Sequence, residues 1–341
     1  MTSALSERGS WAQLPQGTKD AVMHVLASPT LLNLTLDSIS CLPVTFFSID
    51  MKIKYLALRR ITFPRFKPET TSAAFSNYSK MNTDTLEILL HHWFEPRFQT
   101  IIEMPNSFIS RIRHLIIHNF GPTILFADPI MTSALNSLET LQIREERTQS
   151  WKHVPSTRWF QRDLATIPRL KNLEFHFMFG FCTDAEFYQS TTASLRKIIN
   201  LLKVNPTAAQ IQRFSIRFVR CWTELSVRRW FTASDALAIP GHCGEIDQIL
   251  DAGRDRVSSS SGCTVGIDLG LTPRDSRRYL YGGPDDAEWH ELMNRMLDAW
   301  RGKIHAMMPL ASQRRALVFN DIFETRVFCS FYGGTTNDRS H

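Results

Sequence analysis

Residues 53–61 are Ile53-Lys54-Tyr55-Leu56-Ala57-Leu58-Arg59-Arg60-Ile61, which is the pattern I-x-x-L-x-L-x-x-I. The alternation at Leu56 and Leu58 has the period of two that is typical of a strand with one buried face. One such strand would say little about the fold. The same pattern repeated along the chain would predict a stacked array, in which neighbouring copies bury edges that no copy can bury alone.

Five relatives of this pattern, written L-x-x-L-x-L, recur along the chain. Together with the copy at Ile53, they begin at Leu31, Ile112, Leu138, Leu170 and Ile211. A seventh copy begins at Leu86 and breaks the last apolar position, and weaker candidates lie at 264–269 and 315–319. The starts are separated by 22 residues (31 to 53) up to 41 residues (170 to 211). Regular leucine-rich repeats span about 20–29 residues, so we expect an irregular array.

The segments between the copies predict helices. Thr183 and Glu186 form a capping-box pattern that opens an apolar helical face, which ends before Asn205-Pro206. A second helix is predicted after Pro284, and a shorter one around residues 21–26. Helices that alternate with strands favour parallel pairing. We therefore predict an α/β fold, an irregular leucine-rich-repeat-like solenoid with parallel strands on the concave face and helices on the convex face.

One domain accounts for this alternation. We expect a single solenoid over residues 11–331, with disordered ends at 1–10 and 332–341. An exposed loop is predicted over about 251–262, where four serines occur in a row. This loop could hinge two subdomains, but we favour an insertion because helix and strand resume after it in the same order.

The composition excludes several classes of protein. Lys and Arg number 39 against 33 Asp and Glu, a net charge of +6 without the dense clusters that dominate phosphate-backbone binding, so nucleic acid is not an expected partner. The six cysteines form no C-x-x-C pair, which favours reduced thiols in the cytoplasm or nucleus. No apolar run is long enough to predict a secretory signal or a membrane span.

Residues 28–39, with the sequence SPTLLNLTLDSI, are followed by Leu42-Pro43, Phe46-Phe47 and the opening stretch. This series resembles the leucine-rich-repeat-like region of the F-box families of mushroom-forming fungi, in which a Trp and a short helix often come first, as Trp11–Pro15 do here. The resemblance implies a substrate receptor in ubiquitination that binds a Skp1-type adaptor. The ten residues before Trp11 leave no room for an F-box, so we expect the adaptor only if a longer form carries one.

An enzymatic alternative starts from residues 265–270, VGIDLG. They resemble the first phosphate-binding strand and turn of the superfamily of sugar kinases, actin and heat-shock ATPases, which would imply a phosphate- or nucleotide-binding enzyme. No second phosphate loop of the D-x-G-G-G-T kind follows. We favour an ordinary repeat strand, and we expect neither catalysis nor a cofactor.

Two other clusters carry chemically versatile side chains. His242 and Cys243 lie between Gly241 and Gly244, and Glu245 follows. These side chains could bind a metal or support Cys/His nucleophilic catalysis, but zinc needs three or four ligands and no partner pair is present. We predict a solvent-facing turn there and no metal site. Trp222 and Trp230 lie among arginines that could stack with bases, although packing of a helix is the favoured interpretation.

The strongest candidate surface is a column of basic residues. If each copy is numbered from its first apolar residue, position 7 carries Arg or His in six of seven copies: Arg59, His92, His118, Arg144, His176 and Arg217. The whole chain has only 39 Lys and Arg and 11 His among 341 residues, so this is an enrichment. Position 7 could be a tolerant strand end, or it could form a positive ledge that docks a protein partner of acidic character, with binding that strengthens towards pH 6.

Overall fold

The structure is a computed structural model of the chain. It describes residues 9–63, 81–89, 96–103, 107–118, 123–147, 163–179, 184–205, 210–222, 240–254, 263–273 and 286–319. The predictions for His92, for the Trp230 cluster and for the C-terminal tail fall outside these ranges.

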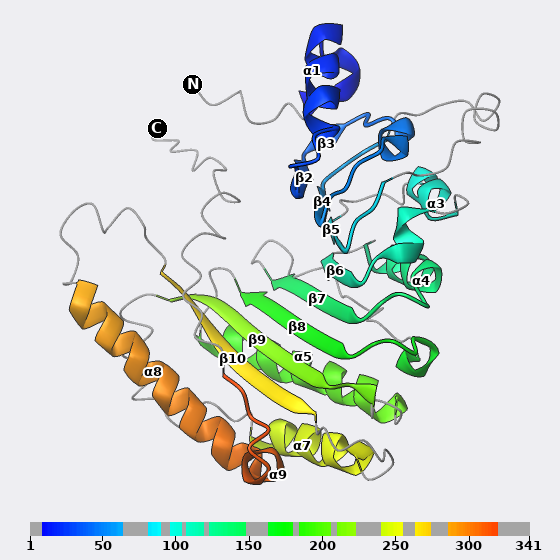
Figure 1. The fold of residues 1–341 in the computed structure, drawn as a ribbon. Helices are drawn as coiled ribbons and strands as arrows, with labels where there is room; N and C mark the ends of the chain where they lie inside the picture. The colour runs from blue at the N-terminus through cyan, green and yellow to red at the C-terminus, as the bar shows by residue number, and fades with distance from the viewer. Residues whose placement is uncertain are drawn as a thin grey trace.

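Eight parallel strands form the main sheet of the described chain. They are β2 (Asn33–Asp37), β4 (Tyr55–Arg59), β5 (Thr85–Leu89), β6 (His114–His118), β7 (Thr140–Arg147), β8 (Asn172–Phe179), β9 (Arg213–Trp222) and β10 (Thr264–Pro273). Their spatial order follows the sequence from β2 to β10, as the colour gradient in Figure 1 shows. A separate two-stranded parallel sheet pairs β1 (Gly9–Ser10) with β3 (Ile39–Ser40).

Seven α-helices are described. They are α1 (Gln16–Leu26), α3 (Pro96–Glu103), α4 (Thr123–Ser133), α5 (Asp184–Val204), α7 (Pro240–Arg254), α8 (Asp286–Met307) and α9 (Pro309–Gln313). Short 3-10 turns lie at η1 (Trp11–Gln13), η2 (Val44–Ser48), η4 (Phe108–Arg111) and η6 (Leu164–Thr166). The predicted helices around 21–26, 183–205 and after Pro284 are confirmed as α1, α5 and α8.

The core lies between the sheet and the helices. Leu56 and Leu58 are fully buried, and their register partners Leu86 and Ile88 continue the same two apolar rows on β5. These rows join buried side chains of α3, α4, α5, α7 and α8 in one cluster. Residues at positions 3, 5 and 7 alternate with these rows and lie on the opposite surface of the sheet, which we call the open face.

The register corrects two of the predicted copies. Leu86 pairs with Leu56, so it occupies position 4 and not position 1, a slip of three residues. Leu89, not His92, therefore pairs with Arg59 in the position-7 column. Ile267 pairs with Ile216, a slip of two residues that keeps the same face buried. A strand with many apolar residues fits the repeat pattern in more than one register, so the pattern alone does not fix which residue occupies which position.

The structure differs from three further predictions about where helices and strands begin or end. Residues 251–254, expected in a loop, complete the last turn of α7, and the rest of that predicted loop lies outside the described residues. Gly9 and Ser10, expected in a disordered end, form β1. The weak candidate strand near residue 317 appears as a single parallel bridge between Leu317 and Val265 at the far edge of the sheet.

Trp300 fastens α8 to this edge of the sheet. Its side chain is 1% exposed, its Nε1 donates a hydrogen bond to the Ile267 carbonyl at 2.7 Å, and its ring meets Phe218 edge-on. The hydrogen bond satisfies a buried polar atom that an indole must otherwise desolvate without compensation.

Replacement of Trp300 by Phe should therefore lower the free energy of unfolding by about 1–3 kcal/mol, since it removes the donor and leaves a buried carbonyl unpaired. Urea denaturation measures this change. Trp11→Phe is the matched control, because Trp11 is only partly buried against Phe46. Equal losses for the two variants would contradict the role given to the hydrogen bond.

Candidate functional site

The position-7 column forms largely as the sequence predicts. His118 pairs with Arg144, Arg144 with His176, and His176 with Arg217, so four of the named residues lie side by side across β6 to β9. Arg59 lies further along the same face but pairs with Leu89. Asp268 continues the column on β10, where it pairs with Arg217.

Glu87 on β5 is the centre of this surface, and its carboxylate is completely buried. Arg59 donates to it at 2.8 Å through Nε and approaches within 2.7 Å through its terminal nitrogen. His118 Nε2 lies 3.0 Å away and an Arg144 nitrogen 3.4 Å away. The hydroxyl of Tyr55 donates a further hydrogen bond. Four side chains from three strands thus converge on a carboxylate whose side chain is 0% exposed.

These contacts determine the ionisation of Glu87 and Tyr55. Burial by itself would raise the pKa of Glu87, but the His118 hydrogen bond and the charge of Arg144 outweigh it and hold the pKa far below its usual range. Burial, together with the hydrogen bond to this carboxylate, raises the pKa of Tyr55 to about 12. Glu87 is therefore an anion and Tyr55 a neutral donor near pH 7.

Gln142 on β7 extends the network towards β8. Arg144 donates to Gln142 Oε1 at 3.2 Å, which fixes the amide oxygen on the arginine side and directs the amide nitrogen towards His176. That nitrogen lies 2.8 Å from His176 Nδ1 and 2.7 Å from His176 Nε2. Because the amide can only donate there, whichever of the two imidazole nitrogens accepts this hydrogen bond must be unprotonated.

His176 is therefore a poor proton acceptor at mildly acidic pH. Its side chain is buried, and burial lowers its pKa, with Arg217 and Arg144 acting in the same direction against the hydrogen bond to Glu174. The sequence predicts that partner binding strengthens towards pH 6 as histidines of the ledge become protonated. His176 does not contribute to that effect, because its lowered pKa keeps it neutral.

The predicted ledge of positive charge is balanced by carboxylates. Arg59, Arg144 and Arg217 share the open face with Glu87, Glu174 and Asp268, so their formal charges cancel. The arginines that the sequence singled out at β4 and β7 are committed to Glu87. Glu87 itself escaped the sequence analysis because the slipped register of its copy assigned it to a different position.

The other sequence candidates change their character in the structure. Residues 264–273 form one continuous strand, β10, in which all ten residues pair with β9, so the proposed phosphate-binding turn is absent. Pro240–Glu245, expected as a solvent-facing turn, is the first turn of α7.

In the described ranges no three His, Cys, Asp or Glu side chains gather as metal ligands do. No described helix has the length and apolar character needed to cross a bilayer.

Cys243 is buried rather than reactive. It is 0% exposed, and burial, helped by the charge of Asp247, raises the pKa of its thiol to about 12. The Asp247 carboxylate accepts hydrogen bonds from the Leu310 and Ala311 amides at 2.8 and 2.9 Å, so it caps α9 and is not a base for the thiol. A nucleophilic cysteine needs the opposite environment.

Comparison of the chain with protein-family models, with curated proteins and with solved structures found no match. The case for function therefore depends on the geometry of the open face.

Replacement of Glu87 by Gln should lower the free energy of unfolding at pH 7 by about 3 kcal/mol or more, because it leaves two arginines and a histidine without their carboxylate. The pKa of Glu87 is depressed in the fold, so its stabilisation is complete above the unfolded value near 4.5 and is lost as the pH falls below it. The difference between wild type and Glu87→Gln should thus shrink below about pH 4.5. Chemical denaturation across pH 3–7 tests this, and a constant difference would contradict it.

Cys243 should resist alkylation in the folded protein, since its thiol is both buried and protonated at pH 8. Iodoacetamide labelling followed by peptide mass spectrometry measures the rate, with the urea-unfolded chain as the control for intrinsic reactivity. Labelling at the same rate in both states would show that the thiol is accessible.

Proposed function

We propose that this chain is a non-catalytic protein-binding scaffold, an irregular solenoid of leucine-rich-repeat type whose open sheet face docks a protein partner. The observation that carries the proposal is the charged network of the open face, in which a buried carboxylate holds side chains from neighbouring strands in fixed positions. Fixed polar groups reduce the entropy that a partner must overcome on binding.

Repetition of one backbone arrangement supports the solenoid. At the start of β4, β6, β7, β8 and β9, two consecutive amides donate to a single carbonyl of the preceding copy. This occurs at the carbonyls of Leu32, Asp84, Arg113, Glu139 and Lys171. After β2 and β4, the equivalent residues Ser38 and Arg60 share a left-handed conformation, with φ of 57° and 54°. Units that repeat their hydrogen bonds in this way stack mainly on their neighbours.

The kind of partner follows from the charge balance. A face with paired arginines and carboxylates suits a polar protein surface that offers both donors and acceptors, with acidic contacts at particular points. The F-box-like resemblance extends this proposal to a substrate-receptor role, in which a Skp1-type adaptor would bind if a longer form carries an F-box.

Arg217→Glu should reduce capture of the partner, because Arg217 lies on the open face beside Glu174 and Asp268 and its reversal would add a third negative charge. The control is Arg196→Glu, an exposed residue of α5 on the helical side. Affinity capture with quantitative mass spectrometry compares the proteins retained by wild type and by each variant. A partner lost from Arg217→Glu and kept by Arg196→Glu is expected, while equal retention by both would contradict the proposed face.

A further inference from the structure

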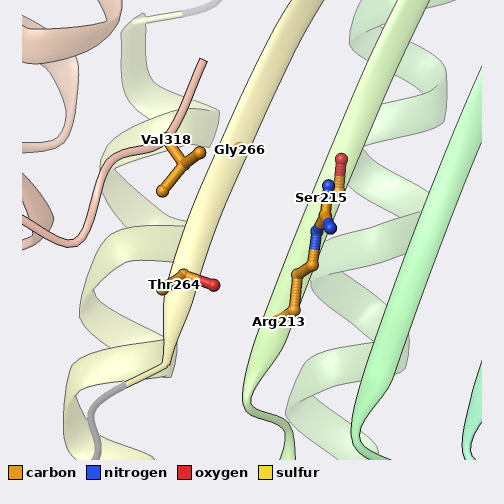
Figure 2. A pocket seen from close by; sticks show the side chains of 5 residues that line it. All are labelled: Arg213, Ser215, Thr264, Gly266 and Val318. Carbon is orange, nitrogen blue, oxygen red and sulfur yellow. The ribbon is translucent and has the colours of Figure 1, made fainter. Parts of the chain in front are cut away.

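A small pocket of about 120 Å³ lies at the far edge of the open face, between β9 and β10. Figure 2 looks onto it with the helices behind the sheet, and it shows Arg213 and Ser215 on β9, Thr264 and Gly266 on β10, and Val318 beyond. The segment that carries Val318 is fixed there, because Val265 accepts a hydrogen bond from the Val318 amide and donates one to the Ala316 carbonyl.

Glycine at position 266 is what keeps the pocket open. A Cβ at this position would lie 3.1 Å from the Val318 carbonyl oxygen and 3.5 Å from Ser215 Oγ. Each of the strands β4 to β9 has a side chain at the equivalent position 5, from Ala57 on β4 to Ser215 on β9. The hollow therefore results from one missing side chain in a row that is otherwise filled.

The polar groups of the pocket have unused hydrogen-bonding capacity. Ser215 is 3% exposed, and its hydroxyl makes no hydrogen bond to any residue of the described ranges. Arg213 is exposed and likewise makes no hydrogen bond or ion pair within those ranges, in contrast to Arg59 and Arg144, which are held by Glu87. The Ser215 hydroxyl lines the pocket and is not among the buried atoms that lack a partner, so a ligand that enters can reach it. Together with the Arg213 guanidinium, which also interacts with the charge of Glu174, it offers two kinds of hydrogen-bond donor.

We propose that this pocket binds a carboxylate group of a peptide, with Arg213 as the cation and Ser215 as the hydroxyl donor. The inference rests on the proposed scaffold function and identifies one chemical feature of its partner. Guanidinium and hydroxyl groups match the planar oxygens of a carboxylate. Glu174 and Asp268 lie nearby on the same face, so the single positive charge of Arg213 suits a monoanion better than a phosphate dianion.

The carboxylate can come from an acidic side chain or from the C-terminus of the partner, and the probes separate these sources. One pair is the capped tripeptide Gly-Glu-Gly and its Gly-Gln-Gly analogue. The other pair is acetyl-Gly-Gly-Val with a free carboxyl end and its amide. Inorganic phosphate is the fifth probe. Methyl NMR of the full chain monitors Val318 in the wall of the pocket, with its resonance assigned from Val318→Ile.

Either carboxylate peptide should shift the Val318 methyl signals, while its amide partner should not. Arg213→Gln should weaken this binding about tenfold or more, as expected for loss of a charged hydrogen-bond donor. Arg113→Gln should not, since Arg113 is an exposed residue directly before β6 that is already paired with Glu139 at 3.0 Å. Gly266→Ala should abolish binding because the new Cβ occupies the pocket.

Ser215→Ala provides a result that a purely structural role would not give. It should weaken carboxylate binding while leaving the melting temperature within about 1 °C of wild type, because the hydroxyl makes no hydrogen bond within the described ranges that the fold would lose. A fall in both binding and stability would show that the hydroxyl serves the fold.

The proposal is overturned if the amide peptides bind as well as the acids, if phosphate binds more tightly than both, or if no probe shifts Val318. It is also overturned if Arg213→Gln binds like Arg113→Gln. If any of these results is found while Arg217→Glu still fails to capture its partner, the pocket proposal is wrong and the scaffold proposal stands. Carboxylate binding without any partner sensitive to Arg217→Glu would instead refute the scaffold and retain the pocket.

Discussion

A carboxylate buried on one face of a parallel sheet, that of Glu87, is the constraint around which the open face is organised. A buried charge is tolerated only when opposite charges and hydrogen-bond donors surround it. Tyr55, Arg59, His118 and Arg144 supply them from β4, β6 and β7. Each of these long side chains loses its freedom in doing so, and the face acquires a defined shape as a result.

The network also links neighbouring strands through their side chains. Arg144 contacts Glu87 on one side and Gln142 on the other, and Gln142 in turn reaches His176. Side chains from β4 to β8 are thereby linked across the sheet on the face away from the helices. The apolar core fastens the same strands from the helical face, where Leu56, Leu86 and Leu115 pack in one row. Parallel pairing in chain order makes both rows continuous.

Much of this fold could be predicted from the spacing of apolar residues. The period of two at Leu56 and Leu58 and the cap at Thr183–Glu186 are local signals, and local signals identified the strands and the longest helices. The register of β5 could not be predicted, because Leu86, Ile88 and Leu89 allow several alignments to the same pattern. Only the observed pairing with Tyr55–Arg59 shows which alignment is correct, and this alignment places Glu87 on the open face. The column of arginines was therefore visible in the sequence, while the carboxylate that holds two of them was not.

The most direct test of this account is a double-mutant cycle between Arg59 and Glu87, with Arg59→Gln, Glu87→Gln and the double variant measured by urea denaturation at pH 7. If Glu87 holds the open face together, the two substitutions should be coupled by at least about 1 kcal/mol. Additive effects, within about 0.3–0.5 kcal/mol, would contradict it.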